Sequence, residues 1–336
     1  MKPQLGVAAA AAACLFAVAG CASGANTTGS GTSGANGGSS TTFVKKDPLI
    51  LGYSVYDQTD PYFIAYAKGV KARAAERGAE VVISDSKDSA QIQVTGSSQL
   101  ISRNISALLI TPVQPDSLPA TISAAHAAKI PVLVGDIGAK GDYDYFVQSN
   151  NEEGGGQAAE YLCKKFDDGQ PHEIAFIRDD PGHAAGEARG KGFKDGLAKC
   201  PNLKLVSEIP GQTVEAAFKA GQDIFAANPN VEAIFGFNSN AVQGAVRASE
   251  TSKKKPTIVG FNGDPIELEL IEQGKQEATV AQDPFGQGQA LVDAALDLLD
   301  GKEPKFTDAA SKTLEQPTTL VTKENLADFK AKLNRQ

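Results

Sequence analysis

Apolar and amphipathic segments alternate along the first half of the chain. Short runs of β-branched and other apolar residues are each followed by a longer amphipathic stretch. Apolar runs that no polar residue interrupts are typical of strands covered on both faces, so the pattern indicates a parallel sheet. It predicts strands at Leu49–Val55, Glu80–Ser84, Ala107–Ile110 and Pro131–Val134, and helices at Phe63–Arg77, Ala90–Arg103 and Leu118–Ala128.

A second series of the same kind begins after Ser149. Its predicted helices are Gly155–Phe166, Ala184–Leu197, Val214–Ala227, Ala241–Ser249 and Pro265–Glu272, and its predicted strands are Glu173–Ile177, Leu203–Ile209, Ala233–Phe237, Thr257–Phe261 and Glu277–Ala281. Helices at Gly288–Leu299 and Lys323–Leu333 follow and are shared between the domains. Strands that alternate with helices indicate an α/β fold, and two similar series predict two doubly wound parallel-sheet domains with a cleft between them.

The N-terminus carries a targeting signal. Residues 1–20 combine a lysine near the start with an uncharged apolar run, which is shorter than the roughly 20 apolar residues of a membrane-spanning helix. The run ends in Val18-Ala19-Gly20-Cys21, which resembles the bacterial lipobox and implies a diacylated Cys21 as the mature N-terminus. An ordinary secretory signal is the alternative. Residues 21–46, rich in Ser, Gly, Thr, Asn and Ala, predict a flexible tether.

Charge and cysteine content narrow the class of protein. A net charge of -8, a pI near 5.1 and the absence of any basic block longer than Lys253–Lys255 argue against a nucleic-acid partner. Outside the signal two cysteines remain, Cys163 and Cys200. An even number in an exported chain favours a disulfide, with two separate buried thiols as the alternative. The three histidines lack metal-ligand spacing, so no metal site is expected. No other cofactor is predicted.

Polar and aromatic residues follow the predicted strands. Ligands bind beyond the carboxyl ends of parallel strands, so these residues are candidates for a binding site. Carboxylates and amides bind pairs of neighbouring hydroxyls, and aromatic faces pack against sugar C–H surfaces, which favours a sugar-type ligand. Taken singly, each candidate has an ordinary structural alternative. The Asp and Asn residues could form turns or cap helices at their N-termini. Tyr62 and Phe63 could belong to the hydrophobic core, and Arg189 could be a solvated helix residue. The candidates at strand ends are Tyr56, Asp60, Tyr62, Phe63, Thr111, Asp136, Asp180, Asn238, Asn262 and Gln282.

Segments across the mature chain resemble the ribose/galactose type of periplasmic binding proteins. The most specific are Asp60–Phe63, Leu108–Pro112, Ile130–Val132 leading into Asp136, Ala188–Phe193, Val259–Gly263 and Ala278–Gln282. The resemblance implies the type I fold of that family, in which the chain crosses three times between two lobes that close on a ligand. It divides this chain into an N-terminal lobe of residues 49–149 plus 283–311 and a C-terminal lobe of residues 150–282 plus 312–336.

The same resemblance assigns site residues. Ligand contacts are expected from Asp60, Tyr62, Phe63 and Asp136 of the first lobe and from Arg189, Asn238, Asn262 and the hinge-proximal Gln282 of the second. Tyr56, Thr111, Ser149, Asp180 and Gln212 are expected along the pocket wall. Arg189 carries the most weight, because a guanidinium fork spans two sugar oxygens; it is expected to lie in an ion-paired cluster with Asp60 or Asp136.

Two departures from the ribose pattern bear on the ligand. Ribose binders follow the fourth-strand Asp with Arg, whereas Ile137 follows Asp136 here, and they carry Asp where this chain has Asn262. The chain also has no Trp on which a hexose ring could stack. These differences favour a smaller or acyclic ligand, such as a pentose, a tetritol or a pentitol.

The sequence therefore predicts an extracytoplasmic lipoprotein that binds a sugar or polyol and delivers it to an ABC transporter permease. A monomer is expected, attached to the cell membrane only through its lipid. An enzyme is disfavoured, because neither a GxxxxGK[ST] phosphate loop nor a Gly-x-Ser-x-Gly elbow occurs. A sensory lipoprotein that presents its ligand to a membrane receptor remains the alternative. A repressor effector domain would need an N-terminal helix-turn-helix, for which the signal and tether leave no place.

Overall fold

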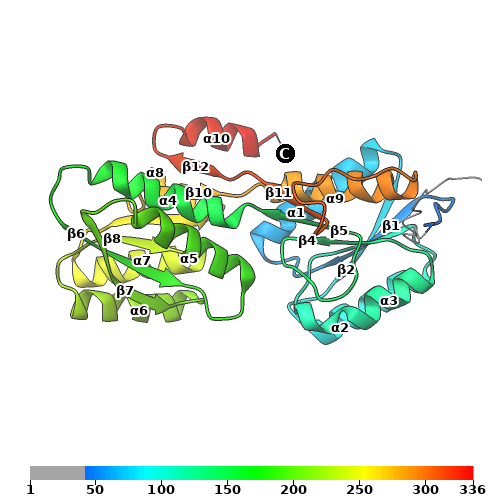
Figure 1. Cartoon of the computed structure of the whole chain (residues 1–336), viewed down its shortest axis with the longest axis horizontal. Coiled ribbons are helices and arrows are strands. Elements are labelled where there is room, and N and C mark those ends of the chain that lie inside the picture. The colour runs from blue at the N-terminus through cyan, green and yellow to red at the C-terminus, as the bar shows by residue number, and fades with distance from the viewer. Residues whose placement is uncertain (1–41, 336) are drawn as a thin grey trace, which may run out of the picture. The chain divides into compact units, whose positions relative to one another are not determined.

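The computed structural model describes residues 42–335. The predicted signal peptide, Cys21 and the tether up to residue 41 lie outside the described residues. Within them the chain forms two α/β lobes, each built on one six-stranded sheet (Figure 1).

The first sheet has the strand order β11-β5-β4-β3-β1-β2, and all of its neighbouring strands are parallel. The strands are β1 (Ile50–Val55), β2 (Glu80–Asp85), β3 (Ala107–Ile110), β4 (Val132–Gly135), β5 (Tyr145–Ser149) and β11 (Thr313–Gln316). The helices of this lobe are α1 (Pro61–Glu76), α2 (Ala90–Ser102), the short 3-10 helix η1 (Pro115–Ser117), α3 (Pro119–Ala127) and α9 (Pro284–Leu299). Helices α1 and α9 cover one face and α2 and α3 the other (Figure 1).

Both faces of this sheet are apolar, as the uninterrupted hydrophobic runs predict. Leu51 and Tyr53 of β1 join the core formed with α1 and α9. On the opposite face, Leu108 and Ile110 of β3 join the core under α2 and α3. Neither face of the central strands meets solvent, which is the physical reason for their lack of polar alternation.

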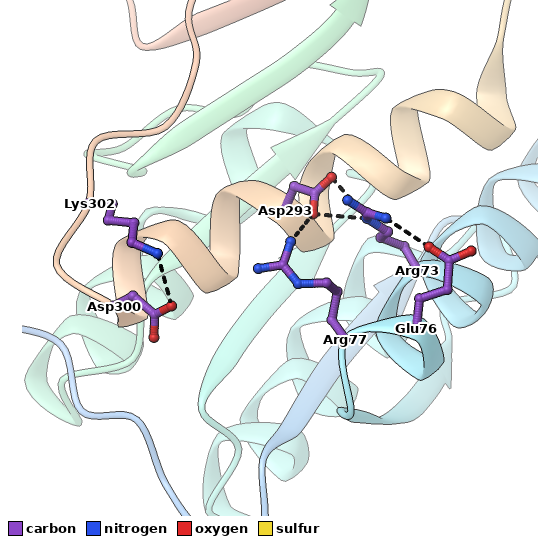
Figure 2. Close-up of polar contacts among 6 residues, drawn as sticks. All are labelled: Arg73, Glu76, Arg77, Asp293, Asp300 and Lys302. Carbon is purple, nitrogen blue, oxygen red and sulfur yellow. Dashed lines mark hydrogen bonds and ion pairs between the residues drawn. The ribbon is translucent and has the colours of Figure 1, made fainter.

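Helix α9 returns to the first lobe late in the sequence and packs closely along α1. Gly69 of α1 and Gly288 of α9 permit this approach, because a Cβ atom at either one would collide with backbone of the other helix. Along the outer edge of the contact, both carboxylate oxygens of Asp293 accept from Arg73 Nε, at 2.9 and 3.0 Å, and one of them accepts from Arg77 Nη1 at 2.6 Å (Figure 2).

The second sheet has the order β12-β10-β9-β8-β6-β7 and is parallel except for the β10–β12 pair. Its strands are β6 (His172–Arg178), β7 (Leu203–Pro210), β8 (Val231–Gly236), β9 (Thr257–Asn262), β10 (Ala278–Ala281) and β12 (Thr319–Thr322). Its helices are α4 (Asn151–Lys165), α5 (Ala184–Leu197), α6 (Val214–Ala227), α7 (Ser239–Ser252), α8 (Pro265–Glu272) and α10 (Leu326–Leu333). The disulfide between Cys163 of α4 and Cys200, just after α5, joins this helix pair, with Cα atoms 5.9 Å apart.

The two sheets repeat one topology. The order β2-β1-β3-β4-β5 in the first lobe matches β7-β6-β8-β9-β10 in the second. In each lobe the order reverses beside the first strand, β1 or β6, so a crevice is expected at the carboxyl ends of these strands. The α/β fold with two doubly wound lobes is therefore confirmed.

The structure adds three strands to the sequence prediction and moves one lobe boundary. Strand β5 (Tyr145–Ser149) is absent from the sequence prediction, as are the short strands β11 and β12. Because β11 pairs with β5, residues 313–316 belong to the first lobe, and the third crossing lies between Gln316 and Thr319 instead of at 311/312.

The predicted tether also ends earlier than residue 46. The Val44 amide donates to the Lys129 carbonyl at 3.2 Å, and the Lys46 amide donates to Ser106 Oγ at 3.1 Å. Residues 44–46 are thus attached to the first lobe, because their backbone is satisfied by partners within it.

Candidate ligand-binding site

Arg189 is a buried residue of α5, with 7 % of its surface exposed, so the alternative of a solvated helix residue is wrong. Its Nε donates to Asn151 Oδ1 at 2.8 Å and its Nη1 to the Phe237 carbonyl at 3.0 Å. The guanidinium carbon lies 3.9 Å from the centroid of the Phe261 ring. A planar cation held by a ring face and by fixed acceptors has a defined orientation.

Two amide side chains complete the surroundings of Arg189. Its Nη1 also donates to Asn262 Oδ1 at 3.2 Å, and its Nη2 donates to Gln282 Oε1 at 3.3 Å. Gln282 Nε2 in turn donates to Asn262 Oδ1 at 2.8 Å. The sequence therefore placed Arg189, Asn262 and Gln282 together correctly.

The expected ion-paired cluster around Arg189 does not form. Among the described residues, every hydrogen bond that Arg189 makes goes to a neutral amide or carbonyl oxygen. Burial lowers the pKa of Arg189, and the negative charge of Asp136 opposes that effect through space. The guanidinium is thus compensated by a carboxylate of the other lobe without direct contact.

The first lobe contributes Tyr62, Phe63 and Asp136. The buried Tyr62 hydroxyl donates to Asp136 Oδ1 at 2.6 Å. Asp136 follows β4 with a left-handed φ of 62°, which turns the chain directly after the strand. Burial raises the pKa of Asp136, while the Tyr62 hydrogen bond and the Arg189 charge favour its ionised form. The Phe63 ring meets Tyr62 edge-on and stacks on Tyr56 with centroids 4.7 Å apart.

Ser149 lies at the first crossing and links the two lobes. Its Oγ donates to Gln282 Oε1 at 2.9 Å and accepts from Gln287 Nε2 at 2.8 Å. Gln287 Oε1 lies 3.3 Å from the Tyr62 hydroxyl. A continuous polar network thus runs from Asp136 in the first lobe to Arg189 in the second. Ser149 is part of this network, because it hydrogen-bonds to both Gln282 and Gln287.

Asp60 and Asn238 serve as helix N-caps, as the ordinary alternative for strand-end residues suggested. Asp60 Oδ1 accepts from the Tyr62 amide at 2.8 Å, and Asn238 Oδ1 accepts from the Ala241 amide at 2.9 Å. Capping leaves the other carboxylate oxygen of Asp60 and the amide nitrogen of Asn238 available to a ligand. Burial also raises the pKa of Asp60.

Three expected wall residues have other surroundings. Thr111 is fully buried, and its hydroxyl accepts from the Tyr56 amide at 2.9 Å, so it fixes the end of β1. Asp180 and Gln212 are exposed, and Gln212 Nε2 lies 3.4 Å from His183 Nδ1. Within the described part of the chain, neither hydrogen-bonds to Arg189 or its partners.

Sequence reasoning missed Asn151 and Gln287. Both lie in the first turn of a helix that follows a crossing between the lobes, α4 and α9. Asn151 follows β5, a strand that the sequence pattern does not predict, and Gln287 lies in α9, several residues beyond the end of β10. The signal that could have found them is a planar amide in the first turn of a helix that begins at a crossing.

The fold and the site together define a class of protein. Two similar α/β lobes bring Arg189, several amides, a carboxylate and aromatic rings together where the chain crosses from one lobe to the other. This arrangement is that of a bilobed binding protein for a small polar ligand. Comparison with known proteins agrees. The family model described as "Periplasmic binding protein domain" matches residues 51–303. The chain is 30 % identical over 271 residues to the "Ribose import binding protein RbsB" of Bacillus subtilis (strain 168), covering 80 % of this chain and 88 % of that protein. This chain therefore belongs to the periplasmic binding protein family, within its ribose/galactose type.

Other relatives and solved structures agree with this assignment. The "D-allose-binding periplasmic protein" of Escherichia coli (strain K12) is 27 % identical, covering 70 % of this chain and 81 % of that protein. A solute binding protein from Actinobacillus succinogenes 130z, solved with bound D-allose, has a TM-score of 0.75 at 23 % identity, covering 83 % of this chain and 99 % of that one. The names of these relatives describe solute-binding proteins. Among the described residues, no helix is both long and apolar enough to span a bilayer.

Proposed function

We propose that this protein is an extracytoplasmic substrate-binding lipoprotein of an ABC importer, and that it captures a small sugar or polyol between its lobes. The observation that supports this most is the buried Arg189, which is oriented by Asn151, Asn262, Gln282 and the Phe261 ring. A guanidinium with no carboxylate in direct contact has its charge available to ligand oxygens.

A neutral hydroxylated ligand fits this set of groups. Arg189 and Asn238 provide donors, whereas Asp60 and Asp136 provide acceptors, so that each ligand hydroxyl can both donate and accept. The Tyr62 and Phe63 rings provide apolar surface for the C–H side of the same ligand. An anionic ligand would meet Asp136, and a cationic one would meet Arg189.

A pentose, a tetritol or a pentitol is the favoured ligand. Asn262 and Ile137 replace an acceptor carboxylate and a donor cation of the ribose pattern, so fewer charged groups are available to hold a ribose ring. The absence of Trp removes the usual stacking surface for a hexose. Structural neighbours show how widely this fold varies: one was solved with myo-inositol and another with L-arabinofuranose.

Thermal unfolding with a compound panel tests the proposal. D-ribose, L-arabinose, D-allose, xylitol, erythritol and myo-inositol are each added to the mature protein. A compound at a hundred times its Kd raises the free energy of unfolding by about 2.7 kcal/mol, which gives a clear rise in Tm. We expect a pentose, xylitol or erythritol to give the largest rise. No rise with any of the six compounds would contradict a sugar- or polyol-binding function.

The lipid anchor is tested separately by expression in a bacterial host. The full-length chain is expected to partition into the detergent phase, and Cys21→Ser is expected to abolish both lipid attachment and this partitioning. Cys14→Ala, a change at the other cysteine of the signal that leaves Val18-Ala19-Gly20-Cys21 intact, is the control. Wild-type protein found only in the aqueous phase would overturn the lipoprotein assignment and leave sugar binding untouched.

A further inference from the structure

Asp264 occupies an N-cap position without capping its helix. It follows β9 and precedes α8, yet its side chain accepts no hydrogen bond from the first turn of that helix. Asp60 before α1 and Asn238 before α7 hold equivalent positions, and both cap. An aspartate at an N-cap normally stabilises its helix in this way. The carboxylate of Asp264 therefore interacts with groups outside the first turn of α8.

The carboxylate of Asp264 is held from one side. Its Oδ2 accepts from Ser239 Oγ and from Asn262 Nδ2, the latter at 3.3 Å. Its Oδ1 accepts no hydrogen bond from a side chain or backbone amide in residues 42–335. The charged groups that act on it through space are Asp60 of the first lobe and Arg189. The open oxygen therefore belongs to a carboxylate that lies among the ligand-site residues.

Behind Asp264 lies Glu267, whose side chain is fully buried. Its Oε1 accepts from Gln276 Nε2 and Thr279 Oγ1, both at 2.9 Å. Its Oε2 accepts from the Gly263 amide at 2.9 Å and lies 3.2 Å from Ser239 Oγ. This is a complete set of partners for a carboxyl group away from water.

The Ser239 hydroxyl lies between two carboxyl groups, but it has one hydrogen to donate. That hydrogen goes to Asp264, because the fully buried Glu267 is the carboxyl group whose protonated form burial favours. The contact with Glu267 is then satisfied when Glu267 is the protonated partner and donates to Ser239 Oγ. Burial, together with the charge of Asp264, raises the pKa of Glu267 to about 8, which agrees with this arrangement.

We propose that Asp264 is a specificity-determining residue that accepts a hydrogen bond from a ligand hydroxyl, and that Glu267, acting through Ser239, is a positioning residue for it. The inference rests on the proposed sugar or polyol function and deepens it. Asn262 cannot serve as the open acceptor, because its Oδ1 already receives Arg189 Nη1 and Gln282 Nε2. The acceptor carboxylate that is missing at position 262 is thus supplied two residues later.

Titration calorimetry at neutral pH tests the role of Asp264. Wild type, Asp264→Asn and the control Glu269→Gln, an exposed residue of the same helix, are titrated with the six compounds of the panel. Asparagine keeps the size and an oxygen for Ser239 but removes the charge. For each compound that wild type binds, we expect Asp264→Asn to raise Kd about tenfold or more, as for a hydrogen bond to a charged group. The control should leave Kd unchanged.

The outcomes separate the two proposals. An unchanged Kd in Asp264→Asn, with wild type binding normally, overturns the role of Asp264 and leaves the proposed function standing. If wild type binds none of the six compounds, the proposed function fails, and the role of Asp264 fails with it. Circular dichroism on each variant shows whether a loss of binding reflects unfolding instead.

A pH profile tests the positioning role of Glu267. Charged groups act through space on both carboxyl groups. The charge of Asp264 raises the pKa of Glu267, while the charges of Asp60 and Arg189 act on Asp264. Once ionised, Glu267 competes for the Ser239 hydrogen, so the wild-type affinity should fall as the pH rises through about 8. In Glu267→Gln this fall should disappear. The same fall in both proteins would show that Glu267 has only a structural role.

Discussion

The two lobes share one strand order but bury different kinds of side chain beneath it. The first lobe places tyrosines in its core, among them Tyr53, Tyr62 and Tyr66. The second places phenylalanines there, and the rings of Phe193 and Phe235 stack with centroids 4.4 Å apart. The same topology thus gives one lobe with buried tyrosine hydroxyls and another whose fully buried aromatic residues, among those the structure describes, are phenylalanines.

This difference explains where each lobe buries its charge. In the second lobe the buried charge is Arg189, which donates to Asn151, Phe237, Asn262 and Gln282 and is covered by the Phe261 ring. In the first lobe, the site charge is Asp136, which receives one hydroxyl from Tyr62. Tyr66, behind it, is buried without a hydrogen-bond partner among the described residues. Buried charge is tolerated when its partners are fixed in advance, and the second lobe meets this condition more fully.

The lobes also differ in how their outer helices are connected. In the second lobe, the disulfide between Cys163 and Cys200 closes a loop with a sequence separation of 37 residues. In the first lobe, α1 and α9 are joined by glycine contacts and by the partly exposed ion pairs of Asp293. Exposed ion pairs contribute little, typically below about 1 kcal/mol each, so the lobes should respond unequally to reduction.

The largest expected effect comes from removing the disulfide. A Cys163→Ala, Cys200→Ala protein should lose about 3–4 kcal/mol of free energy of unfolding, as chain entropy predicts for a loop of this size. The loss should be confined to the second lobe. Denaturant unfolding monitored by hydrogen exchange checks this, and Asp293→Asn is the matched change in the first lobe. Equal destabilisation of both lobes by the cysteine changes would contradict the comparison. Mass spectrometry of non-reduced peptides shows whether the bond forms in exported protein.

Loss of Arg189 should have the next largest effect. Arg189→Ala removes the donors that Asn151, Asn262 and Gln282 orient, and it should raise the Kd of the bound sugar about 30-fold or more, or about 2 kcal/mol and above. Lys191→Ala, an exposed change two residues away on the same helix, should leave Kd unchanged. Titration calorimetry with the compound that gives the largest Tm rise measures both. An equal Kd for Arg189→Ala and wild type would show that the ligand does not bind at Arg189 and would contradict the proposed position of the pocket.

The sequence predicts the central strands well because of the way they are buried. Runs such as Leu108–Ile110 are apolar on both faces and cannot be mistaken for exposed segments. Strand β5 mixes aromatic residues with Gln148 and Ser149, and the short β11 contains Glu315. These strands pair near the edge of the sheet, where tertiary contacts decide the structure more than local pattern does.

The candidate site was predictable where its residues lie at or near the carboxyl ends of strands or in family motifs. Arg189, Asn262 and Gln282 lie together as expected, because family motifs fix their positions along the chain. The residue behind Asp264 was not visible in the sequence. Glu267 becomes recognisable only when the fold brings Gln276 and Thr279 against it, since an isolated Glu in a helix has no pattern that distinguishes burial from exposure.

The stability of the protein should depend on pH through Glu267. Its pKa rises from 4.5 to about 8 on folding, so between these values the native state holds a proton that the unfolded chain has released. The free energy of unfolding should therefore fall as the pH rises through this window, by up to about 1.4 kcal/mol per pH unit. Burial raises the pKa values of Asp264, Asp136 and Asp60 as well, and these contribute with the same sign.

Urea unfolding at a series of pH values measures this slope. Glu267→Gln should flatten the upper part of the window, where Glu267 is the group that titrates, whereas Glu269→Gln on the exposed side of the same helix should not. A slope that is unchanged in Glu267→Gln would mean that Glu267 is ionised in the folded protein and would contradict the raised pKa.

The smallest expected effect concerns the Tyr62 hydroxyl, the sole side-chain donor to Asp136 among the described residues. Tyr62→Phe keeps the ring that packs against Phe63 but removes the hydrogen bond to Asp136, so the free energy of unfolding at neutral pH should fall by about 1 kcal/mol. The pKa of Asp136 should rise further, since the lost hydrogen bond favours the ionised carboxylate. Tyr143→Phe, at a partly exposed tyrosine of the same lobe, should change neither quantity. Carboxyl NMR titration of both variants follows Asp136 directly. If Tyr62→Phe leaves the pKa of Asp136 unchanged, the first lobe holds its charge by burial and the Arg189 field alone, and its tyrosines are then equivalent to the phenylalanines of the second lobe.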